Sequence, residues 1–176
     1  MQDALFRAGL KRQYHAGLAM VRQGIERCPD EAWDSLDRGN AFWRIVYHVL
    51  FYTNVYLQRT EAEFRPCELH QTGLQDLDDV PTPPEIQQYL ELPHRPPRSG
   101  TPYTKEQLLA YWNRCDDLVD GAVEALDLDA PHSGFSWYAM PKIEHQLVAI
   151  RHLQHHVAQL GDRIRAATGT AIEWVR

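Results

Sequence analysis

The sequence predicts an all-α protein, a four-helix bundle with a long proline-rich crossover between the second and third helices. Two observations support this prediction. Four segments place apolar residues at helical spacing, whereas no segment of convincing length alternates as a strand does. Eight of the eleven prolines lie in the segment 66–102, and proline at this density prevents regular structure. The 176 residues fit one domain, 1–176.

The first two helices are expected at residues 3–27 and 41–59. The first ends where Pro29 follows it, because proline cannot continue the helical hydrogen bonding. The second helix follows Gly39 and Asn40, and we expect Asn40 to be its N-cap. This second helix is apolar on nearly every side, so we expect most of its faces to be buried.

The third and fourth helices are expected at residues 104–126 and 141–167. Thr104 and Gln107 form a capping box at the start of the third, and Pro141 is suited to the first helical position of the fourth. An apolar seam with alternating three- and four-residue spacing, typical of bundle helices, follows the fourth helix: Ile150, Leu153, Val157, Leu160 and Ile164.

The proline-rich crossover, residues 66–102, is long enough to traverse the bundle. The second and third helices therefore need not be antiparallel neighbours. Within the crossover, residues 84–90 are compatible with a short helix that begins with proline. The composition of the segment is equally compatible with a lid, a dimer arm and a wrapped surface loop.

Composition excludes several classes of protein. The three cysteines, Cys28, Cys67 and Cys115, form no CxxC pair, which argues against a disulfide scaffold and a cysteine-rich zinc module. The chain lacks an uninterrupted apolar stretch of about 18 residues, and its start lacks the apolar region of a signal peptide. The net charge of −6 is spread along the chain, unlike a nucleic-acid-binding surface. We expect a soluble cytoplasmic protein without membrane or nucleic-acid partners.

Nine histidines are many for this length, and three of them suggest a metal site. His152 and His156 are four residues apart, so both project from one helix face, at the edge of the apolar seam. His48 lies on an apolar face of the second helix. Each could instead be a core histidine hydrogen-bonded to a tyrosine or a carbonyl. Together they make a three-nitrogen site plausible, and three protein ligands with open positions are typical of catalytic metals.

Other metal sites find no support in the sequence. HExxH and CxxCH motifs are both missing, which argues against a zincin and a covalently attached haem. A di-iron bundle needs helical Glu-x-x-His motifs, and the one present, from Glu91 to His94, is interrupted by Pro93.

The side chains near the three histidines leave alternatives open. Gln159 is compatible with a hydrogen bond near the metal and with a surface position, and we favour the surface. His145 lies two turns before His152, too far to be a ligand; it either lines the approach or is a satisfied surface residue, which we favour. We expect His155 to be exposed. The large aromatic residues are expected in the core or at an interface: Trp43, Trp112, Trp137 and Tyr138.

The segments FWRIVYHVLFYTNVYL and IRHLQHHVAQLGDRI resemble the DinB-like (DinB/YfiT-like) metalloenzyme family. In that family a histidine in the middle of the second helix joins a His-x-x-x-His pair in the fourth. The resemblance implies that His48, His152 and His156 are metal ligands, and the family's His-x-x-Gln stretch matches His156 to Gln159. Many members carry Arg-Gly within that stretch, where this chain has Val157-Ala158.

The resemblance further implies a four-helix bundle, often a homodimer, that holds a divalent metal such as zinc or nickel. Relatives include thiol-dependent S-transferases, a mycothiol-dependent maleylpyruvate isomerase and metal-dependent hydrolases. We therefore expect a metal-dependent hydrolase or S-transferase that acts on a small molecule, with a low-molecular-weight thiol in the second case. The alternatives are a non-catalytic metal-binding or dimeric interaction bundle, and a bundle without metal whose histidines are hydrogen-bonded in its interior.

Overall fold

The structure is a computed structural model that describes residues 2–77 and 100–176. Within these ranges the protein is helical and contains no strand, as the sequence predicts. The long helices are α1 (Gln2–Arg27), α3 (Phe42–Tyr56), α5 (Lys105–Ala125) and α6 (Lys142–Thr168). A short helix, α2 (Asp30–Trp33), and a 3₁₀ turn, η1 (Glu61–Glu63), lie in the connections. None of the described helices combines the length and apolar character needed to cross a membrane. The short helix expected at 84–90 lies outside the described residues.

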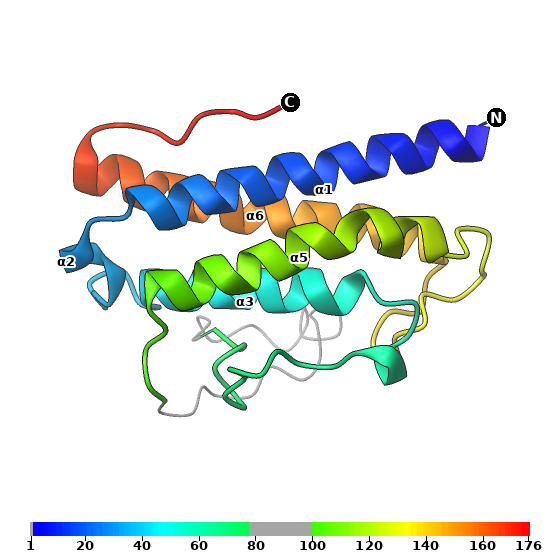
Figure 1. Ribbon diagram of the computed structural model, residues 1–176, viewed down its shortest axis with the longest axis horizontal. Helices are drawn as coiled ribbons and strands as arrows, with labels where there is room; N and C mark the ends of the chain where they lie inside the picture. Colours follow the sequence, from blue (N-terminus) through cyan, green and yellow to red (C-terminus); the bar gives the residue numbers. More distant parts are fainter. Residues whose placement is uncertain (1, 78–99) are drawn as a thin grey trace, which may run out of the picture.

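The four long helices lie side by side along the length of the molecule (Figure 1). α1 packs against α5 and α6, and α3 packs against the same two helices. α1 and α6 run in one direction, whereas α3 and α5 run in the opposite one, so the consecutive long helices α3 and α5 are parallel (Figure 1). A parallel pair requires a connection that returns along the helix length, and the long crossover between Tyr56 and Lys105 makes this return possible.

The helix ends agree with the sequence at the end of α1, which is Arg27, and at the start of α5. They differ at both ends of α3, which stops at Tyr56 instead of residue 59, and at the start of α6. The capping box of α5 is confirmed, because the backbone N–H of Gln107 donates to the Thr104 hydroxyl and the backbone N–H of Thr104 donates to Gln107 Oε1. α3 is capped by Ala41 and not by Asn40, since the extended ψ of 154° at Ala41 delays the first helical residue to Phe42. Pro141 likewise takes the N-cap position of α6 with ψ of 154°, and Lys142 begins the helix.

The core surrounds α3, which is buried on most faces as predicted; thirteen of its fifteen residues are buried. α5 and α6 cover part of this helix, and the Phe64 ring packs against Phe51 of α3. Leu74 and Leu77 of the crossover are buried in the same core. The apolar seam of α6 is buried from Leu153 to Ile164, whereas Ile150 is only partly buried. The four aromatic residues expected in the core or at an interface are buried or packed against the core: Trp43, Trp112, Trp137 and Tyr138.

Candidate metal centre

Three histidine side chains meet between α3 and α6. The Nε2 atom of His152 lies 3.0 Å from Nε2 of His48 and 3.1 Å from Nε2 of His156. One ring nitrogen from each residue lies within 4.8 Å of the other two. His48 and His156 are buried, and His152 is partly buried. The residues that the sequence singles out are therefore brought together in space.

Local structure explains the convergence. His152 and His156 are one turn apart on α6, so their rings project from the same face of that helix. α3 packs against this face, with His48 in the middle of its length. Because α3 is enclosed by α5, α6 and the crossover, its rotation about its own axis is fixed by packing on several sides. The position of His48 is thus determined by the whole core.

Two of the three rings have their proton position fixed by an acceptor oxygen. Nδ1 of His48 lies 2.6 Å from the backbone carbonyl oxygen of Gln75, and Nδ1 of His156 lies 2.8 Å from Oε1 of Gln159. A carbonyl or amide oxygen only accepts hydrogen bonds, so each Nδ1 carries the hydrogen. In the neutral ring Nε2 then presents a lone pair, and both lone pairs point toward the shared centre.

Burial keeps His156 neutral at physiological pH. Loss of hydration lowers the pKa of His156 to about 4, with the hydrogen bond that His156 donates to Gln159 opposing this shift and the nearby His155 adding to it. Neutral imidazole is the form that binds metal ions, so the protein does not need to remove a proton from this ring.

The donor set fits a divalent ion. Ligand nitrogens at ~2.0–2.1 Å from a zinc ion in a tetrahedral arrangement are about 3.3 Å apart. The His152 Nε2 distances of 3.0 and 3.1 Å are close to this separation. Among the residues that the structure describes, no other histidine, cysteine or acidic group joins the three at this spacing. Three imidazoles that could hold a metal ion therefore leave coordination positions for water or substrate.

Aromatic rings and a buried carboxylate adjoin the histidines. The ring of Tyr52 lies 4.8 Å from that of His48 and 5.6 Å from that of His152, centroid to centroid. The Tyr52 hydroxyl donates a hydrogen bond to Asp76, whose side chain is buried. The sequence identifies Tyr52 as a helical neighbour of His48, one turn further along, but sequence reasoning missed Gln75 and Asp76 as neighbours of the site. Gln75 and Asp76 lie in the proline-rich crossover, where no helical or strand periodicity indicates which residues face inward.

The interpretation of His145 as a surface residue is wrong, because its side chain is completely buried. The loop before α6 folds over it: the Phe135 ring stacks on the imidazole at 4.8 Å, and Tyr138 lies 5.1 Å away. The same loop passes close to the backbone at Arg59, which requires Gly134, since its φ is +86° and any side chain there would clash with the Arg59 carbonyl. Burial, with a contribution from the charge of Lys142, lowers the pKa of His145 to about 3.

Gln159 lies at the surface, as favoured from the sequence, yet it also contacts the site through His156. The two alternatives considered for this residue are therefore compatible, because a long amide side chain reaches a buried ring from an exposed backbone position. His155 is exposed, as expected.

Comparison with known proteins identifies the family. The chain matches the DinB superfamily over residues 13–160. Searches of the curated proteins and of the solved structures each found no match. The matched range is well over half of the chain, and it contains all of α3 and α5 together with His48, His152 and His156. This chain belongs to the DinB superfamily.

Proposed function

We propose that this protein is a mononuclear metalloenzyme in which His48, His152 and His156 bind one divalent ion, zinc or nickel. The main support is the convergence of three Nε2 atoms, two of them on rings whose Nδ1 hydrogen is held by an oxygen. This arrangement selects the tautomer that binds metal before any ion arrives. Three protein ligands with further positions left open are typical of catalytic sites, whereas structural zinc sites have four.

An ion at this site would act as a Lewis acid that activates a water molecule or stabilises a thiol in its thiolate form. The residues around it have roles that follow from their contacts. The Gln75 carbonyl orients His48, and the Gln159 amide orients His156. The rings of Tyr52 and Tyr56 lie against His152 and limit the access of bulk water.

Two reaction classes suit such a site. In the first, water is added across a bond of a small-molecule substrate, which is hydrolysis. In the second, the sulfur of a low-molecular-weight thiol displaces a leaving group from the substrate, which is S-transfer. Both need the same open position next to the ion, so the proposal covers both classes.

A second candidate function is a metal clamp without catalysis. It is favoured by one observation: the histidines come from two helices, so an ion would cross-link α3 and α6. A clamp would hold its ion with a closed fourth ligand, and Co²⁺ substitution distinguishes the two candidates. In the enzyme, azide or a small thiol changes the Co²⁺ absorption spectrum by entering the open position, whereas in the clamp the spectrum stays the same.

The first test is elemental analysis of untagged wild-type protein beside His152→Ala and His155→Ala. The second variant is the matched control, because His155 is an exposed histidine on the same helix that contacts His156 but contributes no nitrogen to the cluster. We expect about one zinc or nickel ion per chain in the wild type and the control, and its loss from His152→Ala. Circular dichroism checks that all three proteins remain helical. A wild type that binds no ion, even after incubation with Zn²⁺ and Ni²⁺, would contradict the proposal.

A further inference from the structure

Asp76 is a buried carboxylate in the crossover, with 2% of its surface exposed. Its Oδ1 atom accepts a hydrogen bond of 3.3 Å from the Tyr52 hydroxyl, and its Oδ2 atom accepts one of 3.3 Å from the amide of Gln75. The Nε–H group of Arg44 donates to the backbone carbonyl of Asp76 at 3.0 Å. Both the backbone and the side chain of Asp76 are therefore bonded to residues of α3.

These bonds follow one stripe of α3. Arg44, His48 and Tyr52 are spaced four residues apart, so they lie above one another on successive turns. All three side chains form hydrogen bonds with the dipeptide Gln75-Asp76. Arg44 and Tyr52 donate to Asp76, and His48 donates to the Gln75 carbonyl. The crossover is thus docked over the histidine in the middle of this stripe and held on the turn before it and the turn after it.

The negative charge of Asp76 affects the binding of a cation by the three histidines. Three neutral imidazoles bring no negative charge to a divalent ion, so a negative charge near the site favours binding of the ion before an anionic ligand enters the open position. The carboxylate of Asp76 is bonded to Tyr52, and the Tyr52 ring contacts two of the three histidines. A buried negative charge at this place favours a cation in the site, and the low local polarity strengthens the attraction.

We propose that Asp76 is a positioning residue of the metal site, whose carboxylate holds Tyr52 against the histidines and balances the charge of the bound ion. This inference rests on the proposed function, since it requires that the three histidines bind metal. It goes further by assigning the crossover to the site: without the dipeptide Gln75-Asp76, the His48 ring loses the acceptor that fixes its tautomer.

The test is the Zn²⁺ affinity of Asp76→Asn, measured by competition with a chromophoric chelator. Asparagine keeps the shape and an oxygen that accepts from Tyr52, and it removes the charge together with the oxygen that accepts from the Gln75 side-chain amide. We expect Zn²⁺ to bind ~10- to 100-fold more weakly, as is usual when a residue behind a metal ligand is changed. We also expect the metal-free variant to be about as stable as the metal-free wild type, because the loss of a buried charge offsets the loss of the hydrogen bond from Gln75. A purely structural role predicts the reverse: lower metal-free stability and unchanged Zn²⁺ affinity.

Asp34→Asn is the matched control. Asp34 also accepts a hydrogen bond from an aromatic residue of α3, the Nε1–H group of Trp43 at 2.7 Å. Trp43 lies in the first turn of the helix, more than a turn from His48. The control removes a carboxylate charge by the same substitution at an exposed position away from the histidines, so we expect its Zn²⁺ affinity to equal that of the wild type.

Tyr52→Phe tests the link between Asp76 and the histidines. The ring is kept and the hydroxyl is lost, so we expect a shifted Co²⁺ absorption spectrum and a smaller loss of Zn²⁺ affinity than in Asp76→Asn. Wild-type affinity and an unchanged Co²⁺ spectrum in both variants would overturn this inference and leave the proposed function standing. If Asp76→Asn does not fold, the Zn²⁺ affinity and the Co²⁺ spectrum of Tyr52→Phe alone decide whether the inference holds. A wild type that binds no metal would overturn the proposed function itself, and this inference with it.

Discussion

At the scale of single residues, two oxygen atoms determine which nitrogens of His48 and His156 are available to bind a metal ion. The Gln75 carbonyl and the Gln159 amide hold the hydrogens of His48 and His156 on Nδ1, and this alone directs both Nε2 lone pairs to one point. One oxygen belongs to the backbone of a loop and the other to an exposed side chain. The second can be removed by mutation without disturbing the core, which makes its contribution measurable.

We expect Gln159→Leu to weaken Zn²⁺ binding by ~10-fold, because His156 loses the acceptor that fixes its tautomer. Helicity should not change, since Gln159 is exposed and leucine favours helices. Gln159→Glu is the control: its carboxylate still accepts from Nδ1, so its affinity should equal or exceed that of the wild type. The measurement is chelator competition at constant pH. Equal affinities for the leucine variant and the wild type would mean that Gln159 has no part in the site.

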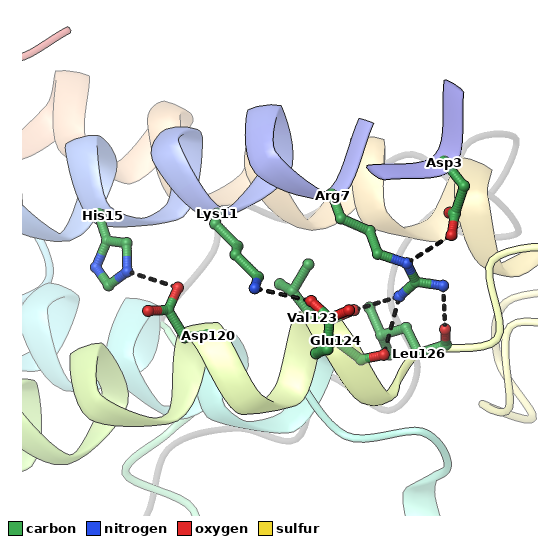
Figure 2. A network of polar contacts seen from close by, with 8 residues as sticks. All are labelled: Asp3, Arg7, Lys11, His15, Asp120, Val123, Glu124 and Leu126. Carbon is green, nitrogen blue, oxygen red and sulfur yellow. Dashed lines mark hydrogen bonds and ion pairs between the residues drawn. The ribbon is translucent and has the colours of Figure 1, made fainter. Parts of the chain in front are cut away.

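At the scale of helices, a single side chain of α1 caps the end of α5 (Figure 2). Arg7 donates to the carbonyl oxygens of Val123, Glu124 and Leu126, and Asp3 accepts from its Nε atom. The last carbonyls of a helix have no partner within the helix, so this guanidinium satisfies groups that α5 itself cannot. The cationic side chain also opposes the partial negative charge at the helix end.

We expect Arg7→Met to lower the free energy of unfolding by ~1.5–3 kcal/mol, the usual range for hydrogen bonds made by a charged group. Methionine preserves the length of the apolar stem, so the loss reports the guanidinium. Arg22→Met is the comparison, because Arg22 makes an exposed ion pair with Glu26 one turn away on the same helix. The Arg22 guanidinium also lies 5.0 Å from the Trp112 ring centre, so the loss of both exposed contacts should cost about 1 kcal/mol or less. Urea denaturation measures both, and equal effects would show that Arg7 is only a surface charge.

The same pair of helices contains a pH-dependent contact. His15 of α1 lies 2.7 Å from Asp116 and 3.4 Å from Asp120 of α5. Burial lowers the pKa of His15, but the hydrogen bonds and charges of the two carboxylates outweigh it and raise the pKa above its ordinary value of 6.5. A raised pKa stabilises the folded state below the unfolded value of 6.5, and this stabilisation is lost as the pH rises through the folded-state pKa.

We therefore expect the wild type to exceed His15→Ala in stability by more at pH 5.5 than at pH 8.5. Because the side chain is 39% exposed, the difference should stay below about 1 kcal/mol. Urea denaturation of both proteins at the two pH values measures it, and 1 M NaCl should reduce it. A difference that is larger at pH 8.5 would show that the histidine is not held by these carboxylates.

Helical periodicity also explains which parts of the fold the sequence predicts. The spacing of His152 and His156 is local, and the apolar surroundings of His48 show that its helix is enclosed, so the site could be expected before the structure. The contact of Gln75 and Asp76 with α3 is not local, and a proline-rich segment has no period that reveals its inner face. The burial of His145 depends in the same way on a loop that folds back over the helix.

At the scale of the whole molecule, the site joins distant parts of the chain. His48 and His152 are 104 positions apart, and the crossover adds Gln75 to the same cluster. An ion bound to the folded state alone shifts the equilibrium away from the unfolded chain by mass action. The stabilisation amounts to about 2.7 kcal/mol when free ion is present at ~100 times its dissociation constant.

We expect Zn²⁺ to raise the melting temperature of the wild-type protein, and EDTA to reverse the rise. For a chain of this size, about 2.7 kcal/mol corresponds to a shift of roughly 5–10 °C. His152→Ala should melt at one temperature with and without Zn²⁺, because the ring that lies between the other two is gone. His155→Ala, which leaves the cluster intact, should respond as the wild type does. Differential scanning calorimetry of the three proteins measures these shifts. If His152→Ala were stabilised as much as the wild type, the ion would bind elsewhere on the molecule, and the three histidines would be interior residues joined by hydrogen bonds.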